Sequence, residues 1–173
     1  MRRDEGLDDP IEREAPSFFC DAMLGGLARW LRAVGYEAAF EHGIDDAALV
    51  ERAGRMGAVL LSSDRPLFDR KLVRTGEVRA LFVPRHAPVL DQVVFVLSTL
   101  RLGVRDLRCM ACGGVLLVVS RDEVIDEAPP RVLASCDEFF RCAGCRHLYW
   151  RGTHWARIEA ARTAIARRLD EKT

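Results

Sequence analysis

Short apolar runs alternate with stretches of helical spacing over the first hundred residues. Residues 17–21 (SFFCD) form an apolar run that ends in an acid, which predicts a strand. The apolar positions of the next segment recur at helical spacing: Leu24, Leu27, Leu31 and Val34. Gly35 can end this helix in a left-handed conformation. The pattern therefore predicts a strand followed directly by a helix.

The same alternation continues to residue 102. Further strands are predicted at residues 36–40, 58–62 and 78–83, and further helices at residues 46–56, 65–74 and 89–102. Residues 44–46 supply an N-cap for the first of these helices, whose apolar positions are Leu49, Val50, Ala53 and Met56. The run at 58–62 has the form of a buried parallel strand. Four strand–helix repeats predict the α/β class, a parallel sheet with helices on both faces.

The pattern changes after Gly103. Short apolar runs at residues 115–119 and 138–142 predict small antiparallel strands, and an Arg-rich helix is predicted from residue 153 to residue 169. The buried stripe of that helix would comprise Trp155, Ile158, Ala161 or Arg162, and Ile165. We therefore divide the chain into a mobile tail (1–16), an α/β domain (17–104) and a small C-terminal domain with a basic helix (105–173).

Composition supports a folded chain and locates its positive charge. The 173 residues are 49% hydrophobic and 30% charged, which excludes disordered and collagen-like chains. Lys and Arg (26) balance Asp and Glu (26), which argues against a protein that coats nucleic acid by bulk charge. Residues 141–173, however, hold seven Arg and one Lys against three acids, a net of +5. A basic face is expected near the C-terminal end.

Neither a membrane span nor a secretory signal is predicted. The apolar stretches fall short of the roughly 20 residues that a membrane helix needs, and Arg29 and Arg32 interrupt the first of them. Residues 1–17 are acidic and lack an apolar segment typical of signal peptides. We expect a cytoplasmic protein that does not bind membranes.

Four of the six cysteines have the spacing of a metal site. Cys109, Cys112, Cys142 and Cys145 form C-x2-C-x29-C-x2-C, with two glycines after the first pair and one inside the second. Two such pairs complete a tetrahedral four-thiolate site for Zn²⁺, which leaves no open position and is therefore structural. Local disulfides and free thiols are the alternatives. Cys20 and Cys136 fit neither pair and are predicted to be buried free thiols.

Three aspartates fall where the carboxyl ends of parallel strands converge. Asp21 ends the first strand, Asp64 follows the third, and Asp46 opens the helix between them. Carboxylates brought together repel one another, so the arrangement is favourable mainly with a bound divalent cation, Mg²⁺ or Mn²⁺. Alternatively, Asp46 is only an N-cap and the other two are solvated loop acids.

Aromatic and basic residues alternate beside the second cysteine pair, from Tyr149 to Trp155. Such residues can stack on unpaired bases while arginines contact phosphates. The side chains expected to contact RNA are Arg151, His154, Arg157 and Arg162. The alternative is that the aromatic rings only pack the small domain and that the arginines form a solvated helix face.

With these residues identified, the chain resembles the Mut-seven C-terminal RNase family, in which a PIN-like nuclease domain precedes a zinc ribbon. The resemblance extends from about Phe18 to Ile158. Its motifs are FFCDAMLGGLARWLRAVGY, LLSSD, and the first cysteine pair together with FFRCAGCRHLYWRGTHW, the most specific of the three.

The resemblance implies a set of site residues. Asp21, Asp46 and Asp64 correspond to the three metal-binding acids, and Ser62 stands where the PIN-like pattern usually has threonine. Asp45 competes with Asp46 for the second position. Asp69 is a candidate fourth acid, and whether the site holds one metal or two depends on it.

The activity implied by the resemblance is metal-dependent hydrolysis of RNA that leaves 5′-phosphate and 3′-hydroxyl ends, with single-stranded or looped RNA as substrate. A non-catalytic zinc-ribbon adaptor that binds RNA or ribosomes is the alternative from another class, and a protein-binding zinc module is a third. The RNA substrate, endo- or exonuclease action and the oligomeric state stay open.

Overall fold

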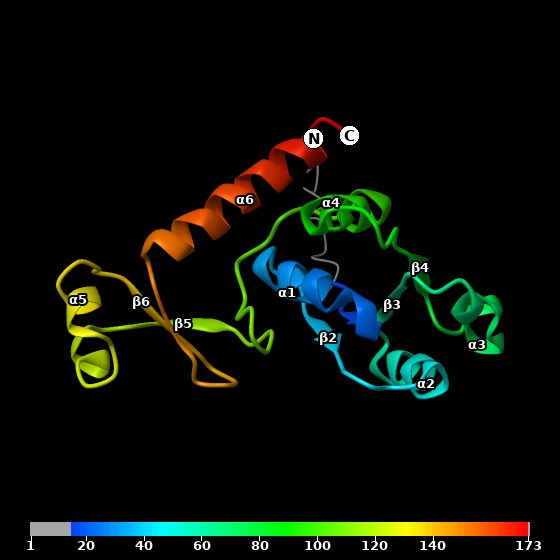
Figure 1. The fold of residues 1–173 in the computed structure, drawn as a ribbon, viewed down its shortest axis with the longest axis horizontal. Helices are drawn as coiled ribbons and strands as arrows, with labels where there is room; N and C mark the ends of the chain where they lie inside the picture. Colours follow the sequence, from blue (N-terminus) through cyan, green and yellow to red (C-terminus); the bar gives the residue numbers. More distant parts are fainter. Residues whose placement is uncertain (1–14, 173) are drawn as a thin grey trace, which may run out of the picture.

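The computed structural model of the chain describes residues 15–172 and contains a parallel sheet, an antiparallel sheet and a long C-terminal helix (Figure 1). The tail predicted at residues 1–16 lies outside the described residues except for its last two positions. The α/β class is confirmed by the order of strands and helices before residue 100.

The parallel sheet has four strands in the order β2-β1-β3-β4. The strands are β1 (Phe18–Cys20), β2 (Ala38–Phe40), β3 (Val59–Ser62) and β4 (Ala80–Phe82). Side chains of β1 alternate between two cores: Phe18 and Cys20 pack into the core on one face, and Phe19 packs into the core on the other. Because both faces are covered, β1 and β3 read as continuous apolar runs.

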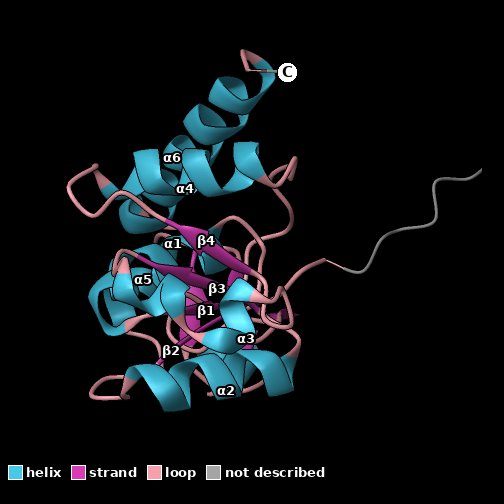
Figure 2. Cartoon of the chain, turned by 90° about the vertical axis from the view of Figure 1, so that its right-hand side faces the viewer, coloured by secondary structure: helices cyan, strands magenta, loops and turns pink. Residues whose placement is uncertain are grey.

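Helices cover both faces of this sheet, as predicted (Figure 2). On one face lie the 3₁₀ helix η1 (Ala22–Leu24), α1 (Gly25–Ala33) and α4 (Val89–Thr99), and on the other lie α2 (Asp46–Met56), the 3₁₀ helix η2 (Pro66–Asp69) and α3 (Lys71–Arg74). The single helix predicted at 65–74 is interrupted at Arg70, which has an extended backbone. Met56 was predicted on the apolar side of α2 but is 51% exposed, because it is the last residue before the helix ends at Gly57.

The turn that leaves α1 depends on Gly35. Its φ is +97°, and a Cβ built there would lie 2.5 Å from Arg105 Cβ and 2.7 Å from the Asp106 carbonyl oxygen. The predicted left-handed glycine after this helix is therefore confirmed. It also allows residues 105–106 to approach the end of α1.

We expect Gly35→Ala to destabilise the fold by roughly 3 kcal/mol or more, because backbone strain and a steric clash add. Gly57→Ala is the matched control, since φ is +62° there but no atom lies within 4 Å of the added Cβ. That variant should lose only about 1 kcal/mol. Urea unfolding of the two variants measures the difference, and equal losses would show that the approach of Arg105 is unimportant.

The second sheet is antiparallel and small, with the order β5-β6-β7. Its strands are β5 (Leu116–Val119), β6 (Phe139–Cys142) and β7 (Leu148–Trp150), and the 3₁₀ helix η3 (Asp122–Val124) and α5 (Pro130–Leu133) lie between β5 and β6. Val124, Val132, Cys136 and Phe139 form its core. The antiparallel strands predicted at 115–119 and 138–142 are confirmed.

The C-terminal helix α6 (Thr153–Asp170) runs from the small sheet back to α4 (Figure 1). Its buried side chains are Trp155, Ile158, Ile165 and Leu169. Ile165 and Leu169 join the core of the parallel sheet, whereas Ile158 packs against Ala33 and Met110. The helix therefore contacts both parts of the chain. Within residues 15–172, no helix combines the length and the apolar character that crossing a membrane requires.

Candidate functional site

Asp21, Asp46 and Asp64 line one cavity of about 200 Å³ at the carboxyl edge of the parallel sheet. Asp21 follows β1, Asp64 lies two residues after β3, and Asp46 is the first residue of α2. The structure thus brings together three acids that are far apart in the sequence. We call this space the acidic cavity.

Hydrogen bonds hold Asp21 in a fixed orientation. Asp21 is only 7% exposed; its Oδ1 accepts from the Met23 N–H at 2.8 Å, and its Oδ2 accepts from the Ser63 N–H at 3.0 Å and from the Ser62 hydroxyl. Ser62 is fully buried, and its Oγ accepts from the Asp64 N–H at 3.0 Å. The Ser62 hydroxyl therefore connects the first acid to the loop that carries the third.

Asp45 and Asp46 have different roles. The Asp45 carboxylate caps α2 by accepting from the N–H groups of Ala47 at 2.9 Å and Ala48 at 3.1 Å, and these hydrogen bonds lower the pKa of Asp45. Asp46 lines the acidic cavity, and one of its carboxylate oxygens lies 3.7 Å from Nη2 of Arg70. The alternative in which Asp46 is only the N-cap is therefore wrong, because Asp45 takes that position.

Asp69 and Arg85 show where expectations from sequence differ from the structure. Asp69 is exposed in η2 and is not among the residues that line the acidic cavity. Arg85 does line it, although the sequence pattern did not single it out. A signal was present: Arg85 comes shortly after β4, so the rule that locates the acids at the strand ends applies to it as well. It introduces a positive charge next to the three acids.

The donor set of the acidic cavity fits a hard divalent cation, because Mg²⁺ and Mn²⁺ prefer carboxylate oxygens. The three carboxylates are nevertheless not gathered around one point. Among residues 15–172, the cysteine quartet is the one group of three or more His, Cys, Asp or Glu side chains close enough to share an ion. Asp64 is exposed and Asp46 is partly exposed, so packing does not fix either side chain in a single rotamer.

The cysteine quartet consists of Cys109, Cys112, Cys142 and Cys145, whose sulfur atoms all lie within 4.8 Å of one another. All four are free thiols, with 3.6 Å between Cys109 and Cys145 and 3.4 Å between Cys112 and Cys142. These separations exclude disulfides and approach the ligand spacing of about 3.8 Å that a tetrahedral Zn²⁺ with Zn–S bonds of about 2.3 Å requires. The group can therefore bind zinc. Cys20 and Cys136 are buried and free, as predicted.

Hydrogen bonds favour ionisation of one thiol in the quartet. Burial acts to raise the pKa of Cys109, but hydrogen bonds from the Tyr149 hydroxyl, at 3.1 Å, and from the backbone N–H groups of Cys112 and Ala111 outweigh it and lower the pKa to about 6. A thiolate is the form that coordinates zinc. The local electrostatics are thus compatible with a cation at this position.

Arg32 ties the quartet to the α/β part of the chain. Its Nε donates to the Ala38 carbonyl at 2.8 Å, and its Nη1 donates to the carbonyls of Ala111 at 2.7 Å and Met110 at 3.2 Å. Both acceptors in the second group lie within the first cysteine pair. One guanidinium therefore links β2 to the turn that carries two of the cysteines.

The basic residues expected to contact RNA are not equally available. His154 and Arg157 are exposed on α6. Arg151 is exposed and pairs with Glu138 at 2.7 Å. The Arg162 side chain is only 15% exposed and donates to Glu159 at 2.9 Å and to the Arg105 carbonyl at 2.6 Å.

The aromatic residues of this region also differ in how available they are to a ligand. Trp155 stacks on Phe140 with ring centroids 4.7 Å apart, so the packing alternative holds for this ring. Tyr149 and Trp150 are partly exposed.

A family model described as the Mut7-C RNAse domain matches residues 16–162, which include the acidic cavity, the quartet and the first half of α6. The chain belongs to the Mut7-C RNAse domain family. The resemblance inferred from its motifs is confirmed. The Mut7-C match also supports a nuclease-like function at the level of the family.

One relative of this Mut7-C chain is a human protein named "Exonuclease mut-7 homolog", which is 35% identical over 124 residues. The aligned region is 68% of the Mut7-C chain but only 14% of the human protein. No solved structure matches the chain.

Proposed function

We propose that this protein is a metal-dependent ribonuclease in which Asp21, Asp46 and Asp64 hold Mg²⁺ or Mn²⁺, while the cysteine quartet holds a structural Zn²⁺. The observation that carries the proposal is the acidic cavity, because it combines three carboxylates from separate elements in a chain of the Mut7-C RNAse domain family. A metal-dependent ribonuclease needs such a site to bind a cation beside the scissile phosphate.

The side chains of the acidic cavity would have different roles in the reaction. A divalent cation bound there supplies polarisation of a phosphate oxygen and a water of lowered pKa. Asp21 is the fixed ligand, because Ser62 and the backbone N–H groups around it hold its carboxylate in place. Asp46 and Asp64 complete the negative set, and one of them orients the attacking water. Arg85, at the rim, pairs with a phosphate oxygen.

RNA contacts beyond the acidic cavity are assigned to Arg151, His154 and Arg157, which are exposed. Arg162 supports this surface indirectly, since its guanidinium holds α6 against the Arg105 carbonyl. Single-stranded or looped RNA suits these groups, because its bases are free to stack on aromatic rings.

Purified protein should hydrolyse single-stranded RNA only when Mg²⁺ or Mn²⁺ is present and should leave 5′-phosphate and 3′-hydroxyl ends. Sequencing the products of RNA incubated with the wild type and with Asp21→Asn tests this directly. RNA binding without hydrolysis under any divalent cation would instead favour the adaptor alternative. The absence of any salt-sensitive RNA affinity would favour a protein-binding module.

Arg157→Ala should weaken RNA binding and reduce the slope of log K against log salt by about one, because one phosphate contact is lost. Arg162→Ala is the contrasting variant, since its side chain is already engaged with Glu159 and Arg105. It should lower thermal stability and leave the salt slope nearly unchanged. Binding isotherms at several salt concentrations separate the two, and an unchanged slope for Arg157→Ala would remove that residue from the interface.

A further inference from the structure

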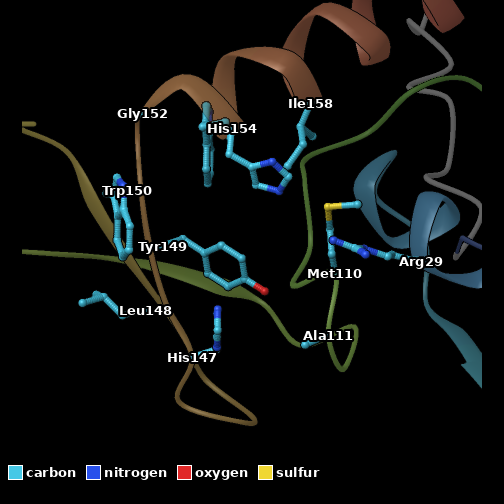
Figure 3. Close-up of a pocket in the computed structure, with 11 residues that line it drawn as sticks. Arg29, Met110, Ala111, His147, Leu148, Tyr149, Trp150, Gly152, His154 and Ile158 are labelled. Carbon is cyan, nitrogen blue, oxygen red and sulfur yellow. The ribbon is translucent and has the colours of Figure 1, made fainter. Parts of the chain in front are cut away.

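A second cavity, of about 470 Å³, lies between α1 and the segment that joins β7 to α6. Arg29 and Met110 line one side, and Tyr149 and His154 face them across the space (Figure 3). Trp150 lies beyond Tyr149, on the side away from Arg29 and Met110. We call this space the aromatic cavity. Its volume is typical of a site for a small molecule and is too small for a helix.

We propose that the aromatic cavity binds one unpaired base of the RNA that the acidic cavity is proposed to cleave. The inference rests on the proposed function for the identity of the ligand, but the cavity itself does not depend on it. A base needs a flat apolar surface on which to stack and polar groups at the rim for its edge and its phosphate. The lining residues provide both.

The stacking surface is held in place before any ligand binds. The Tyr149 hydroxyl contacts Cys109 Sγ at 3.1 Å, which ties the ring to the quartet. Trp155, which also lines the cavity, is stacked on Phe140. The indole N–H of Trp155 is buried and has no hydrogen-bond partner among the described residues. Rigid rings lose little entropy when a base stacks on them, so this geometry favours binding.

The charge around the aromatic cavity suits a nucleotide. The polar lining groups include Arg29, His147 and His154, and no Asp or Glu is among the described residues that line it. Arg29 and His154 are exposed, so both can reach a phosphate at the mouth of the cavity. An apolar peptide side chain would use the rings but not this positive rim. An unpaired base with its attached phosphate uses both.

The position of the cavity relative to the acids also fits one RNA strand. Met23 lines the acidic cavity and Arg29 lines the aromatic cavity. Met23 lies in η1 and Arg29 lies in α1, six positions further along the chain, so the two residues are at most roughly 20 Å apart. A single strand with one base in the aromatic cavity would thus run beside α1 toward the three acids.

Titration of the zinc-loaded full chain with adenosine 5′-monophosphate, without Mg²⁺ or Mn²⁺, tests the cavity separately from catalysis. Binding is followed by tryptophan fluorescence, because Trp150 and Trp155 line the cavity and only one other tryptophan is present in the chain. We expect saturable quenching by the nucleotide. Ribose 5-phosphate, which carries the same phosphate without a base, should bind at least tenfold more weakly.

Arg29→Ala and His154→Ala should each weaken binding of adenosine 5′-monophosphate by roughly three- to tenfold. Arg167→Ala is the matched control, since Arg167 is exposed on α6 but does not line the cavity, and its affinity should equal that of the wild type. Zinc content and melting temperature confirm that each variant is folded. Equal binding of the two ligands, or equal affinity of all variants, would overturn the aromatic cavity as a base site.

The same titration on Asp21→Asn keeps this proposal distinct from the proposed function. Nucleotide binding should persist in that variant, because Asp21 does not line the aromatic cavity. RNA hydrolysis by the wild type without nucleotide binding would overturn the base site alone. Nucleotide binding without RNA hydrolysis would overturn the proposed ribonuclease function and would still support the base site in the aromatic cavity.

Discussion

Replacing Asp21 by Asn is expected to slow RNA hydrolysis by roughly 10²–10³-fold. Asparagine keeps the shape of the side chain but removes the charge that holds a hard divalent cation. Loss of metal-ion catalysis amounts to several kcal/mol of transition-state stabilisation, and each 1.4 kcal/mol is a factor of ten in rate. Asp46→Asn and Asp64→Asn should lose most activity as well. Initial rates of cleavage at saturating Mg²⁺ measure all three.

Two neighbouring acids provide matched controls for this prediction. Asp45→Asn should keep nearly full activity and the α2 cap, because asparagine is also a good N-cap and Asp45 does not line the acidic cavity. Asp69→Asn should lose less activity than the three principal variants, since Asp69 lies outside the cavity lining. Full divalent-dependent activity of Asp21→Asn or Asp64→Asn in highly purified protein would refute the assigned site.

Stability without metal gives an independent measure of the acidic cavity. Asp64→Asn should leave the free energy of unfolding unchanged or raise it slightly, because repulsion among the carboxylates is relieved. Asp21→Asn should not show this gain, because its new amide group cannot accept from both the Met23 and Ser63 N–H groups, which costs about 1–3 kcal/mol. Mg²⁺ should raise the melting temperature of the wild type more than that of either variant.

Removal of zinc is the second change for which we expect a large effect, here on the stability of the small antiparallel sheet. Protein prepared without chelators should contain about one zinc per chain, and structural zinc contributes on the order of 10 kcal/mol in small peptides. A strong chelator should therefore unfold the small antiparallel sheet. The parallel sheet should largely persist, because its two cores are built mainly from residues 18–97. Elemental analysis and hydrogen exchange, resolved by segment, measure the two effects.

Two contacts connect the small domain to the parallel-sheet part of the chain, so the loss of zinc should also affect that part. Arg32 bonds to the turn of the first cysteine pair, and α6 packs against α4, so α1 and α4 should lose some protection when zinc is removed. Cys112→Ser should lose zinc, whereas Cys136→Ser should keep it, because Cys136 lies outside the quartet. If the small antiparallel sheet stays intact in zinc-free protein, zinc does not have a structural role.

The sequence by itself determined the elements whose pattern is local. A period of two or of 3.6 residues reflects which faces are buried, so the four parallel strands and the helices on both faces could be predicted from residue spacing. The two C-x2-C pairs could also be recognised from the sequence, since the geometry within a pair depends on a turn of four residues. Cys20 and Cys136 do not fit that spacing, and they were predicted as buried because a free thiol packs like a small apolar side chain.

Only the tertiary structure decided which residues come together at one site. Asp45 and Asp46 are adjacent and identical in type, and their roles differ only because one points to the start of α2 and the other lines the acidic cavity. The arginines of α6 look alike in sequence, yet Arg162 contacts a carbonyl 57 positions away. The aromatic cavity joins Arg29 of α1 to Tyr149 of β7. Such contacts depend on long-range packing, which leaves no periodic signal in the chain.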